Sequence, residues 1–319
     1  MSNLQTTIKS SITLKGVGIH TGKDVSLTFK PAEEDVGYVF SRTDLPNKPS
    51  IKALSEYVCE TQRGTTLEKD GVKLKTTEHV LAALVGLEID NIIIEIDGEE
   101  PPIMDGSSKF FVNALEEVGI VQQSKLRSEF IIKDVIHFRD DETGSEITII
   151  PADNYQVTTM VDYETKVLGT QNATLNNLKE FKSDFANART FSFLHEIEML
   201  LENDLIKGGD LNNAIVYVDK KISNETMGKL KKAFNRDKVS VKPNGILDNL
   251  NLHYQNEAAR HKLLDVLGDL ALIGKRIRGK VIAKKPGHYI NTKFAKKLSE
   301  IIKKQEKLEL DTVSYTHLT

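Results

Sequence analysis

The strongest constraint on the fold is that two stretches of the chain follow one plan. His79-Val-Leu-Ala-Ala-Leu-Val-Gly86 and His261-Lys-Leu-Leu-Asp-Val-Leu-Gly268 each begin with a histidine, continue as an apolar run and reach a glycine seven residues later. In both copies a β-rich segment (91–96 and 279–283), a proline-containing loop and a second helical pattern follow. This repetition predicts that two histidines converge across a pseudo-symmetric interface, a geometry suited to holding a metal ion.

Strand patterns are repeated as well. Val25-Ser-Leu-Thr-Phe29 and Glu146-Ile-Thr-Ile-Ile150 have the period of two expected of half-buried strands, and Pro-Ala follows each of them. Each half of the chain therefore predicts strands, a helix, a strand and a helix. The repeat is about 130 residues long, far beyond solenoid periods, which indicates a duplicated α+β domain with one topology in both copies.

These patterns also predict where the domains begin and end. We expect a first domain over residues 1–124 and a second over 125–302, with the polar, non-periodic stretch 121–128 as the linker. The second domain carries an apolar, glycine-broken insertion at about 190–220, which is suited to walling off a hydrophobic pocket, although ordinary core packing is the commoner role. The polar tail 303–319 is either a linker to a further domain or a non-native end.

Composition limits the class of protein and of metal site. Hydrophobic content of 39% and charged content of 28% are typical of a soluble globular chain, and a net charge of −3 gives no reason to expect nucleic acid as a partner. A single cysteine, Cys59, excludes a Cys-rich zinc site, so histidines and carboxylates must hold any metal. Neither a secretory signal nor a run near ~18 apolar residues is present, so we expect a cytoplasmic protein without a transmembrane segment. We also expect the protein to be a monomer.

The second copy carries the clearest metal-binding pattern. His261 and Asp265 are four residues apart, so on a helix they lie about 40° apart on one face, and Asp269 continues that face one turn further. Burying such carboxylates unpaired is costly, and coordination to a cation offsets the cost. The alternative is a solvated His-Asp pair on an exposed face.

Together with His79, these residues supply two imidazoles and one carboxylate. Zinc accepts this set in tetrahedral geometry and keeps a fourth position for water, which is typical of a catalytic site. Iron(II) fits the same ligands, so the pattern predicts a metal more firmly than it predicts which metal.

Proton-transfer groups accompany both copies. Thr76 or Thr77 is suited to cap the first helix, which places Glu78 in the first turn, where the helix dipole favours its charged form. Glu78 is therefore the candidate general base. In the second copy His288 follows a Lys-Pro-Gly loop and is a candidate general acid, with Asp269 to orient it. A helix-capping or surface role for His288 is the alternative.

Several motifs then occur in an order that resembles a known family. They are Gly16-Val-Gly-Ile-His-Thr-Gly22, Thr77-Glu-His79, Pro102-Ile-Met-Asp-Gly-Ser107, Ala188-Arg-Thr-Phe191, the segment from His261 to Asp269, and Gly287-His288. Over residues 5–302 the chain resembles the UDP-3-O-acyl-N-acetylglucosamine deacetylases, the zinc amidases that commit Gram-negative bacteria to lipid A synthesis. The resemblance implies two α+β domains packed face to face, with the active site between them.

The resemblance also implies a role for individual residues. It places the zinc ligands on His79, His261 and Asp265, the base on Glu78, and the cationic acid on His288 with Asp269 as its partner.

Further positions follow from the same resemblance. Thr190 matches a hydroxyl that stabilises the oxyanion, Lys262 a basic residue near the reacting centre, and Lys285 one near the substrate diphosphate. The acyl-chain tunnel of the family falls on Phe191, Leu194, Ile197, Leu211, Ala214 and Val216.

The implied reaction is hydrolysis of the N-acetyl group of a UDP-linked acylated amino sugar to acetate and the free amine. Three alternatives stay open. The chain is a metal amidase of the same fold acting on another acylated sugar, the deacetylase part of a longer chain with a hydroxyacyl dehydratase domain, or a non-catalytic protein whose His/Asp cluster staples two domains together.

Overall fold

The first half of the chain forms a five-stranded sheet. The structure is a computed structural model, and it describes residues 3–202, 208, 213–220, 222–233, 239–248 and 250–316. The sheet has the order β2 (Ile12–Val17), β3 (Asp24–Pro31), β9 (Ile92–Ile96), β4 (Tyr38–Arg42), β5 (Ser50–Lys52). Along β3 every second side chain is buried, as the alternation of the sequence predicts.

The second half forms a sheet with the same plan. Its order is β12 (Ile136–Asp140), β13 (Ser145–Ile150), β18 (Arg276–Lys284), β14 (Tyr155–Asp162), β15 (Thr170–Leu175), and β11 (Glu129–Ile131) pairs with β18 beside this path.

The two sheets share their strand directions as well as their order. The middle strand of each sheet comes last in sequence: β9 runs antiparallel to β3 and parallel to β4, while β18 runs antiparallel to β13 and parallel to β14. The outer hairpin partners are antiparallel in both. The α+β class with one topology in both halves, predicted from the repeated patterns, is confirmed.

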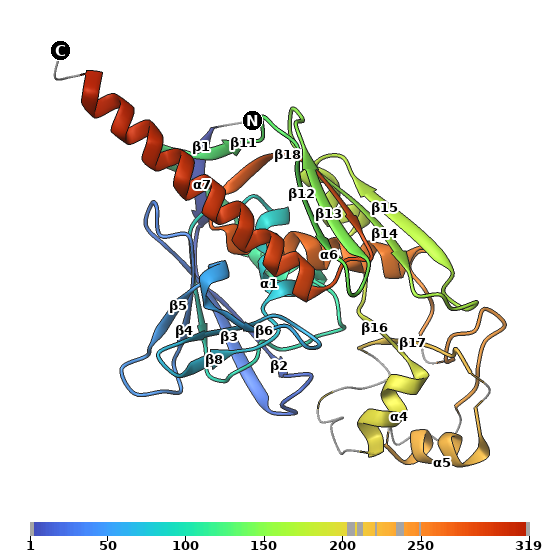
Figure 1. The fold of residues 1–319 in the computed structure, drawn as a ribbon. Helices are drawn as coiled ribbons and strands as arrows, with labels where there is room; N and C mark the ends of the chain where they lie inside the picture. The colour runs from blue at the N-terminus through green and yellow to red at the C-terminus, as the bar shows by residue number, and fades with distance from the viewer. Residues whose placement is uncertain are drawn as a thin grey trace.

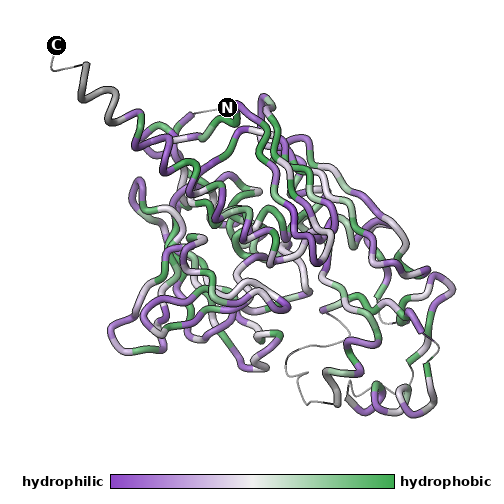
Figure 2. Tube along the Cα trace, viewed as in Figure 1, coloured by the Kyte–Doolittle hydropathy of each residue, from purple (hydrophilic) through white to green (hydrophobic). Residues whose placement is uncertain are grey.

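The repeated helices lie between the two sheets (Figure 1). α1 (Glu78–Gly86) packs against α6 (Glu257–Leu270), and α6 also packs on β14 and β15. Val80 to Leu84 are fully buried, so α1 is covered on every side, and Figure 2 shows hydrophobic residues along this central region. α2 (Lys109–Val118) and α7 (His288–Thr316) are the second helices of the two halves.

The remaining short elements lie in the connections. A three-stranded sheet joins β6 (Val58–Glu60), β7 (Thr66–Lys69) and β8 (Val72–Leu74), and η1 (Ser55–Tyr57) precedes it. In the second half η2 (Leu178–Glu180) and α3 (Phe181–Asp184) follow β15, and η3 (Ala271–Ile273) follows α6.

The insertion forms a separate lobe, drawn at the lower right of Figure 1. It contains β16 (Phe191–Phe193), α4 (Leu194–Glu202), β17 (Ile215–Tyr217) and α5 (Asn224–Ala233). The apolar helical pattern of the sequence starts at Phe191, but the helix begins at Leu194, because residues 191–193 pair in parallel with β17. A small hydrophobic core forms here from Leu194, Ile197, Val216, Leu230 and Leu247.

Two stretches without a clear pattern in the sequence are regular in the structure. The expected linker contains β10 (Ile120–Leu126), which pairs antiparallel with β1 (Leu4–Ile8). Its side chains are almost all exposed, so no alternation of hydrophobic and polar residues marks it. The tail also differs from expectation, since α7 continues through it to Thr316.

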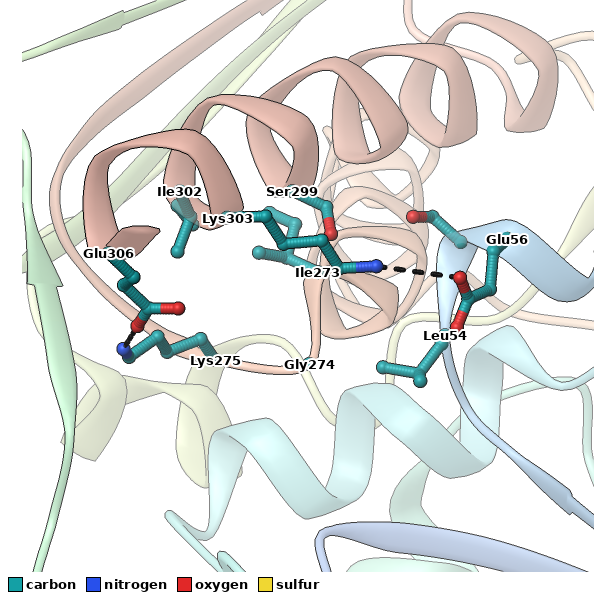
Figure 3. Close-up of a pocket in the computed structure, with 10 residues that line it drawn as sticks. Leu54, Glu56, Ile273, Gly274, Lys275, Ser299, Ile302, Lys303 and Glu306 are labelled. Atoms are coloured by element: carbon teal, nitrogen blue, oxygen red, sulfur yellow. Dashed lines mark hydrogen bonds and ion pairs between the residues drawn. The ribbon is translucent and has the colours of Figure 1, made fainter. Parts of the chain in front are cut away.

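Ion pairs hold α7 against both halves, around a cavity of about 180 Å³ (Figure 3). Lys303 of α7 lies 3.4 Å from the carboxylate of Glu56 in the first half, and Glu306 accepts from Lys275 in the second. No described helix is long and apolar enough to cross a membrane.

Candidate metal centre

The structure brings His79 and His261 together with Asp265, although about half of the chain separates the first histidine from the other two residues. One ligand atom of each lies within 4.8 Å of those of the others, and all three residues are buried. The Oδ1 atom of Asp265 lies 3.7 Å from Nε2 of His79 and 3.4 Å from Nε2 of His261. The imidazole rings are nearly perpendicular, with centroids 5.0 Å apart. As predicted from the sequence, His261 and Asp265 lie one helical turn apart on α6, and His79 lies in the first turn of α1.

Hydrogen bonds from neighbouring groups orient two of the three side chains, His261 and Asp265. Nδ1 of His261 lies 3.0 Å from the carbonyl oxygen of Ala188, which leaves Nε2 facing Asp265. Lys262 donates from Nζ to Oδ2 of Asp265 at 2.8 Å. Oδ1 of Asp265 is buried and has no hydrogen-bond partner among the described residues. A buried carboxylate oxygen between two imidazole nitrogens is suited to a divalent cation, so the residues fit a metal.

Burial and charge give these groups the protonation states that metals require. Burial disfavours the imidazolium form and, with His261 nearby, lowers the pKa of His79 to about 3. Burial likewise lowers the pKa of His261. Burial alone would raise the pKa of Asp265, but His261 and Lys262 outweigh it and lower that pKa. Neutral imidazoles and an ionised carboxylate are the forms that bind zinc.

A buried ion pair supports the segment whose carbonyl oxygen contacts His261. Arg189 donates to Glu257 Oε1 from its backbone nitrogen at 3.2 Å and from Nε at 2.9 Å. Glu257 also accepts from the backbone nitrogen of His253 at 2.7 Å. Arg189 follows Ala188 directly, so this pair fixes the carbonyl that orients His261.

A second group of ionisable side chains lies beside the cluster. His288 places Nε2 3.8 Å from Oε1 of Glu78, and its Nδ1 lies 2.9 Å from Oδ2 of Asp269. Burial raises the pKa of Glu78 to about 7, with Asp269 adding to the shift and His288 opposing it. Burial disfavours the charged form of His288, but Asp269 and Glu78 outweigh it and raise its pKa to about 9. Near neutral pH one group can therefore accept a proton while the other carries one.

Close backbone contact makes this geometry possible. A Cβ at Gly268 would lie 2.1 Å from the carbonyl oxygen of Glu78, so only glycine lets α6 approach the start of α1 at this point. Thr77 occupies the N-cap position, but its hydroxyl donates to the carbonyl oxygen of Thr65 instead of capping α1. Thr76 has a φ of 51°, unusual for a β-branched residue, and donates to Glu100 at 2.8 Å.

Three further predicted site residues, Lys262, Thr190 and Lys285, make contacts of different kinds. Lys262 lies over the ring of Phe191 at 5.5 Å, and that ring is 6.3 Å from His261. The backbone of Thr190 bonds to Gly106 and Ile215. The Nζ atom of Lys285 donates to Glu164 at 3.0 Å.

The residues assigned to an acyl-chain tunnel lie in the insertion. Leu194, Ile197 and Val216 are buried against one another, Ala214 is half-buried, and Leu211 lies outside the described residues. Ordinary core packing gives the same burial, so contact with an acyl chain stays a prediction.

Two residues of the site were not anticipated from the sequence. Thr65 donates to both Glu78 and Asp269, and Asn291 donates to Asp269 at 2.9 Å. Neither residue stands at a short helical spacing from these partners, so no local pattern marks it.

A buried His-His-Asp cluster between two like sheets, next to a carboxylate and a charged imidazole, defines an α+β protein with a candidate catalytic metal centre. The sequence model of the family described as UDP-3-O-acyl N-acetylglycosamine deacetylase matches residues 5–239 and 225–300. The chain belongs to this family.

Individual proteins similar to this chain also carry the name of this family. A UDP-3-O-acyl-N-acetylglucosamine deacetylase of Thermodesulfovibrio yellowstonii is 40% identical over 297 residues, which cover 93% of this chain and 92% of the relative. Two proteins named bifunctional enzyme LpxC/FabZ are more similar: that of Bacteroides thetaiotaomicron is 46% identical and that of Porphyromonas gingivalis 44%. Both matches include 95% of this chain, but they span only 66% and 65% of these longer relatives.

Proposed function

We propose that the chain hydrolyses the N-acetyl amide of UDP-3-O-((R)-3-hydroxyacyl)-N-acetylglucosamine, giving the free amine and acetate, the committed step of lipid A biosynthesis. The observation that carries the proposal is the cluster of His79, His261 and Asp265 beside the Glu78–His288 pair. Membership in the deacetylase family and the names of the similar proteins support this choice of substrate.

His79, His261 and Asp265 would hold the metal, which we propose to be zinc, with iron(II) as the alternative ion. When bound there, such an ion lowers the pKa of a coordinated water to ~7 and polarises the amide carbonyl. Lys262 and the carbonyl of Ala188 keep the carboxylate and one imidazole turned toward the ion.

The two proton-transfer groups have different roles in the proposed reaction. Glu78, whose pKa lies at about 7, accepts the proton of the attacking water at Oε1 or Oε2. His288 is protonated at neutral pH and delivers the proton from Nε2 to the departing amine nitrogen, while Asp269 holds Nδ1. The hydroxyl of Thr190 donates to the oxyanion that forms when the carbonyl is attacked.

The proposed substrate contacts come from the resemblance to the deacetylase family. In this proposal Lys262 contacts the substrate near the reacting amide and Lys285 near the diphosphate. The apolar side chains proposed to line the acyl chain are Phe191, Leu194, Ile197, Leu211, Ala214 and Val216. With the expected domain boundary near residue 124, Glu78 and His79 belong to one domain and the other reacting groups to the second.

The relatives favour one variant of this proposal. Because the chain spans about two thirds of the bifunctional relatives, we propose as a second candidate that it is the deacetylase part of a longer chain with a hydroxyacyl dehydratase domain. A metal amidase acting on another acylated sugar is the remaining alternative.

The test combines metal analysis with a substrate assay. Purified protein should contain one divalent metal per chain and release acetate from the UDP-linked substrate, and removal of the metal by a chelator should abolish the release. Protein that binds the metal without releasing acetate would support a role in stapling the two domains instead. Acetate release only from other acylated sugars would support the amidase alternative.

A further inference from the structure

Thr65 lies at the contact between the two halves, directly before β7. It is fully buried and takes part in four hydrogen bonds. Its backbone nitrogen donates to Glu78 Oε2 at 3.0 Å, and its hydroxyl donates to Asp269 Oδ1 at 2.6 Å. Its carbonyl oxygen accepts from the backbone nitrogen and the hydroxyl of Thr77, both at 3.3 Å. One residue of the first half thus holds a carboxylate from each half.

Both oxygens of Asp269 are then occupied. Oδ1 accepts from Thr65, while Oδ2 accepts from His288 Nδ1 and from Asn291 Nδ2, each at 2.9 Å. Both bonds from the second half reach Oδ2, so the hydroxyl of Thr65 is the group among the described residues that holds the other oxygen, Oδ1. Without it, the carboxylate of Asp269 would be held at one oxygen alone.

The carboxylates of Glu78 and Asp269 flank His288, and like charges in a buried space repel each other. Hydrogen bonds to carboxylates are among the stronger ones in proteins, and two such bonds from a single residue set the separation of the two groups. We propose that Thr65 is a positioning residue, which fixes Asp269 relative to Glu78 so that His288 faces the reacting centre. This inference rests on the proposed function, since it concerns how the acid and the base are placed.

The hydroxyl can be removed with little change of shape. Thr65→Val keeps the backbone bond to Glu78 and the side-chain volume but loses the donor to Asp269. We expect kcat to fall about 10- to 100-fold, the cost of a small misplacement of a reacting group, with KM within about twofold and full metal content. Thr65→Ser keeps the hydroxyl and should restore kcat to within about threefold of the wild-type value. Thr65→Ala removes the same hydroxyl and serves if valine is not accommodated.

A matched control separates this effect from the loss of any buried hydroxyl. Thr159 is also fully buried, and its hydroxyl donates to the carbonyl oxygen of Ala259 in α6 at 3.0 Å, so its partner is a backbone group and not an ionisable side chain. Thr159→Val should leave kcat unchanged. If both valine variants lowered kcat equally, the effect of Thr65 would be general packing, and the proposal would be wrong.

A double-mutant cycle tests whether Thr65 acts on kcat through Asp269. In an Asp269→Ala background the acceptor of the Thr65 hydroxyl is already gone, so Thr65→Val should lower kcat by less than about threefold further. Equal effects of Thr65→Val in both backgrounds would overturn the coupling through Asp269.

A final measurement does not depend on the substrate. The Nδ1 proton of His288 exchanges with water only when its hydrogen bond to Asp269 opens, so NMR should show exchange at least about tenfold faster in Thr65→Val but not in Thr159→Val. Faster exchange in a protein that is inert on the nucleotide sugar would retain the positioning role and reject the proposed function. Unchanged exchange and unchanged kcat would reject the positioning role alone.

Discussion

Lys262 donates to Oδ2 of Asp265 at 2.8 Å, and this bond leaves the other oxygen of that carboxylate buried without a hydrogen-bond partner among the described residues. The free oxygen lies between the Nε2 atoms of two histidines. A carboxylate held in this way cannot turn its free oxygen to solvent. It therefore favours a bound cation over an empty site, because an unpaired buried oxygen is costly.

Removing this carboxylate should empty the site. Asp265→Ala deletes one of the three proposed ligands and leaves two neutral imidazoles, so we expect purified protein to contain little divalent metal and to show no acetate release. Metal analysis by mass spectrometry checks the first expectation. A full equivalent of metal in this variant would contradict the ligand assignment.

His288 should matter for turnover and not for the metal. His288→Ala removes the proton donor, which contributes typically about 10²- to 10⁴-fold to rate, while the three metal-binding side chains stay in place. We expect kcat to fall in that range with the metal content unchanged. Wild-type turnover in His288→Ala would exclude the general-acid role.

The rate should depend on pH through the same two groups. Glu78 acts as a base only when ionised, so activity rises as pH passes its pKa, which burial raises to about 7 and which a bound cation shifts downward. His288 acts as an acid only when protonated. Activity should therefore fall as pH rises through about 9, the pKa that Asp269 and Glu78 maintain against burial. A profile of kcat/KM against pH checks this, and a rate that keeps increasing well above that basic limit would contradict the assignment.

The close approach of α6 to α1 should make Gly268 intolerant of substitution. In Gly268→Ala the new Cβ would lie 2.1 Å from the carbonyl oxygen of Glu78, so the helices must separate at a cost of roughly 1–3 kcal/mol in unfolding free energy. Gly228 in α5 is the matched control, since nothing lies within 4 Å of its added Cβ. Gly228→Ala should stabilise the protein by about 0.5–1 kcal/mol, because alanine favours a helix. Thermal unfolding of both variants distinguishes the two results, and equal melting temperatures would contradict the role of Gly268.

The ion pair of Arg189 with Glu257 should also be needed for stability. Glu257→Gln leaves a buried guanidinium without its counter-charge, which costs about 3 kcal/mol. The ion pair of Glu146 with Lys284 is exposed, so Glu146→Gln should leave stability unchanged. Denaturant unfolding of the two variants measures the difference. A similar loss of unfolding free energy in both variants would show that burial of the Arg189–Glu257 pair does not add to its contribution to stability.

Much of this metal centre could be predicted from residues that lie close together in the sequence. Helical spacing is enough to place His261 and Asp265 on one face, and a helix start is enough to place Glu78 beside His79. Duplication then indicates that the two helices face each other. Each of these inferences depends on residues close together in sequence, or on a pattern that occurs twice.

Other features have no local signal. Thr65 and Asp269 meet across 204 positions, and threonine next to a strand is ordinary in any sheet protein. β10 is exposed along its length, so it lacks the alternation that a half-buried strand shows, and only its pairing with β1 makes it a strand. The monomeric state and the acyl-chain contacts stay predictions, because both depend on partners outside the chain.

The proposed deacetylase activity depends on one divalent ion held jointly by the two halves of the chain. Anomalous diffraction at the zinc edge from crystals of the metal-loaded protein tests this most directly. We predict a single strong peak at roughly 2.0–2.2 Å from Nε2 of His79, Nε2 of His261 and Oδ1 of Asp265. A peak bound by other residues, or no peak in protein that retains its metal in solution, would contradict it.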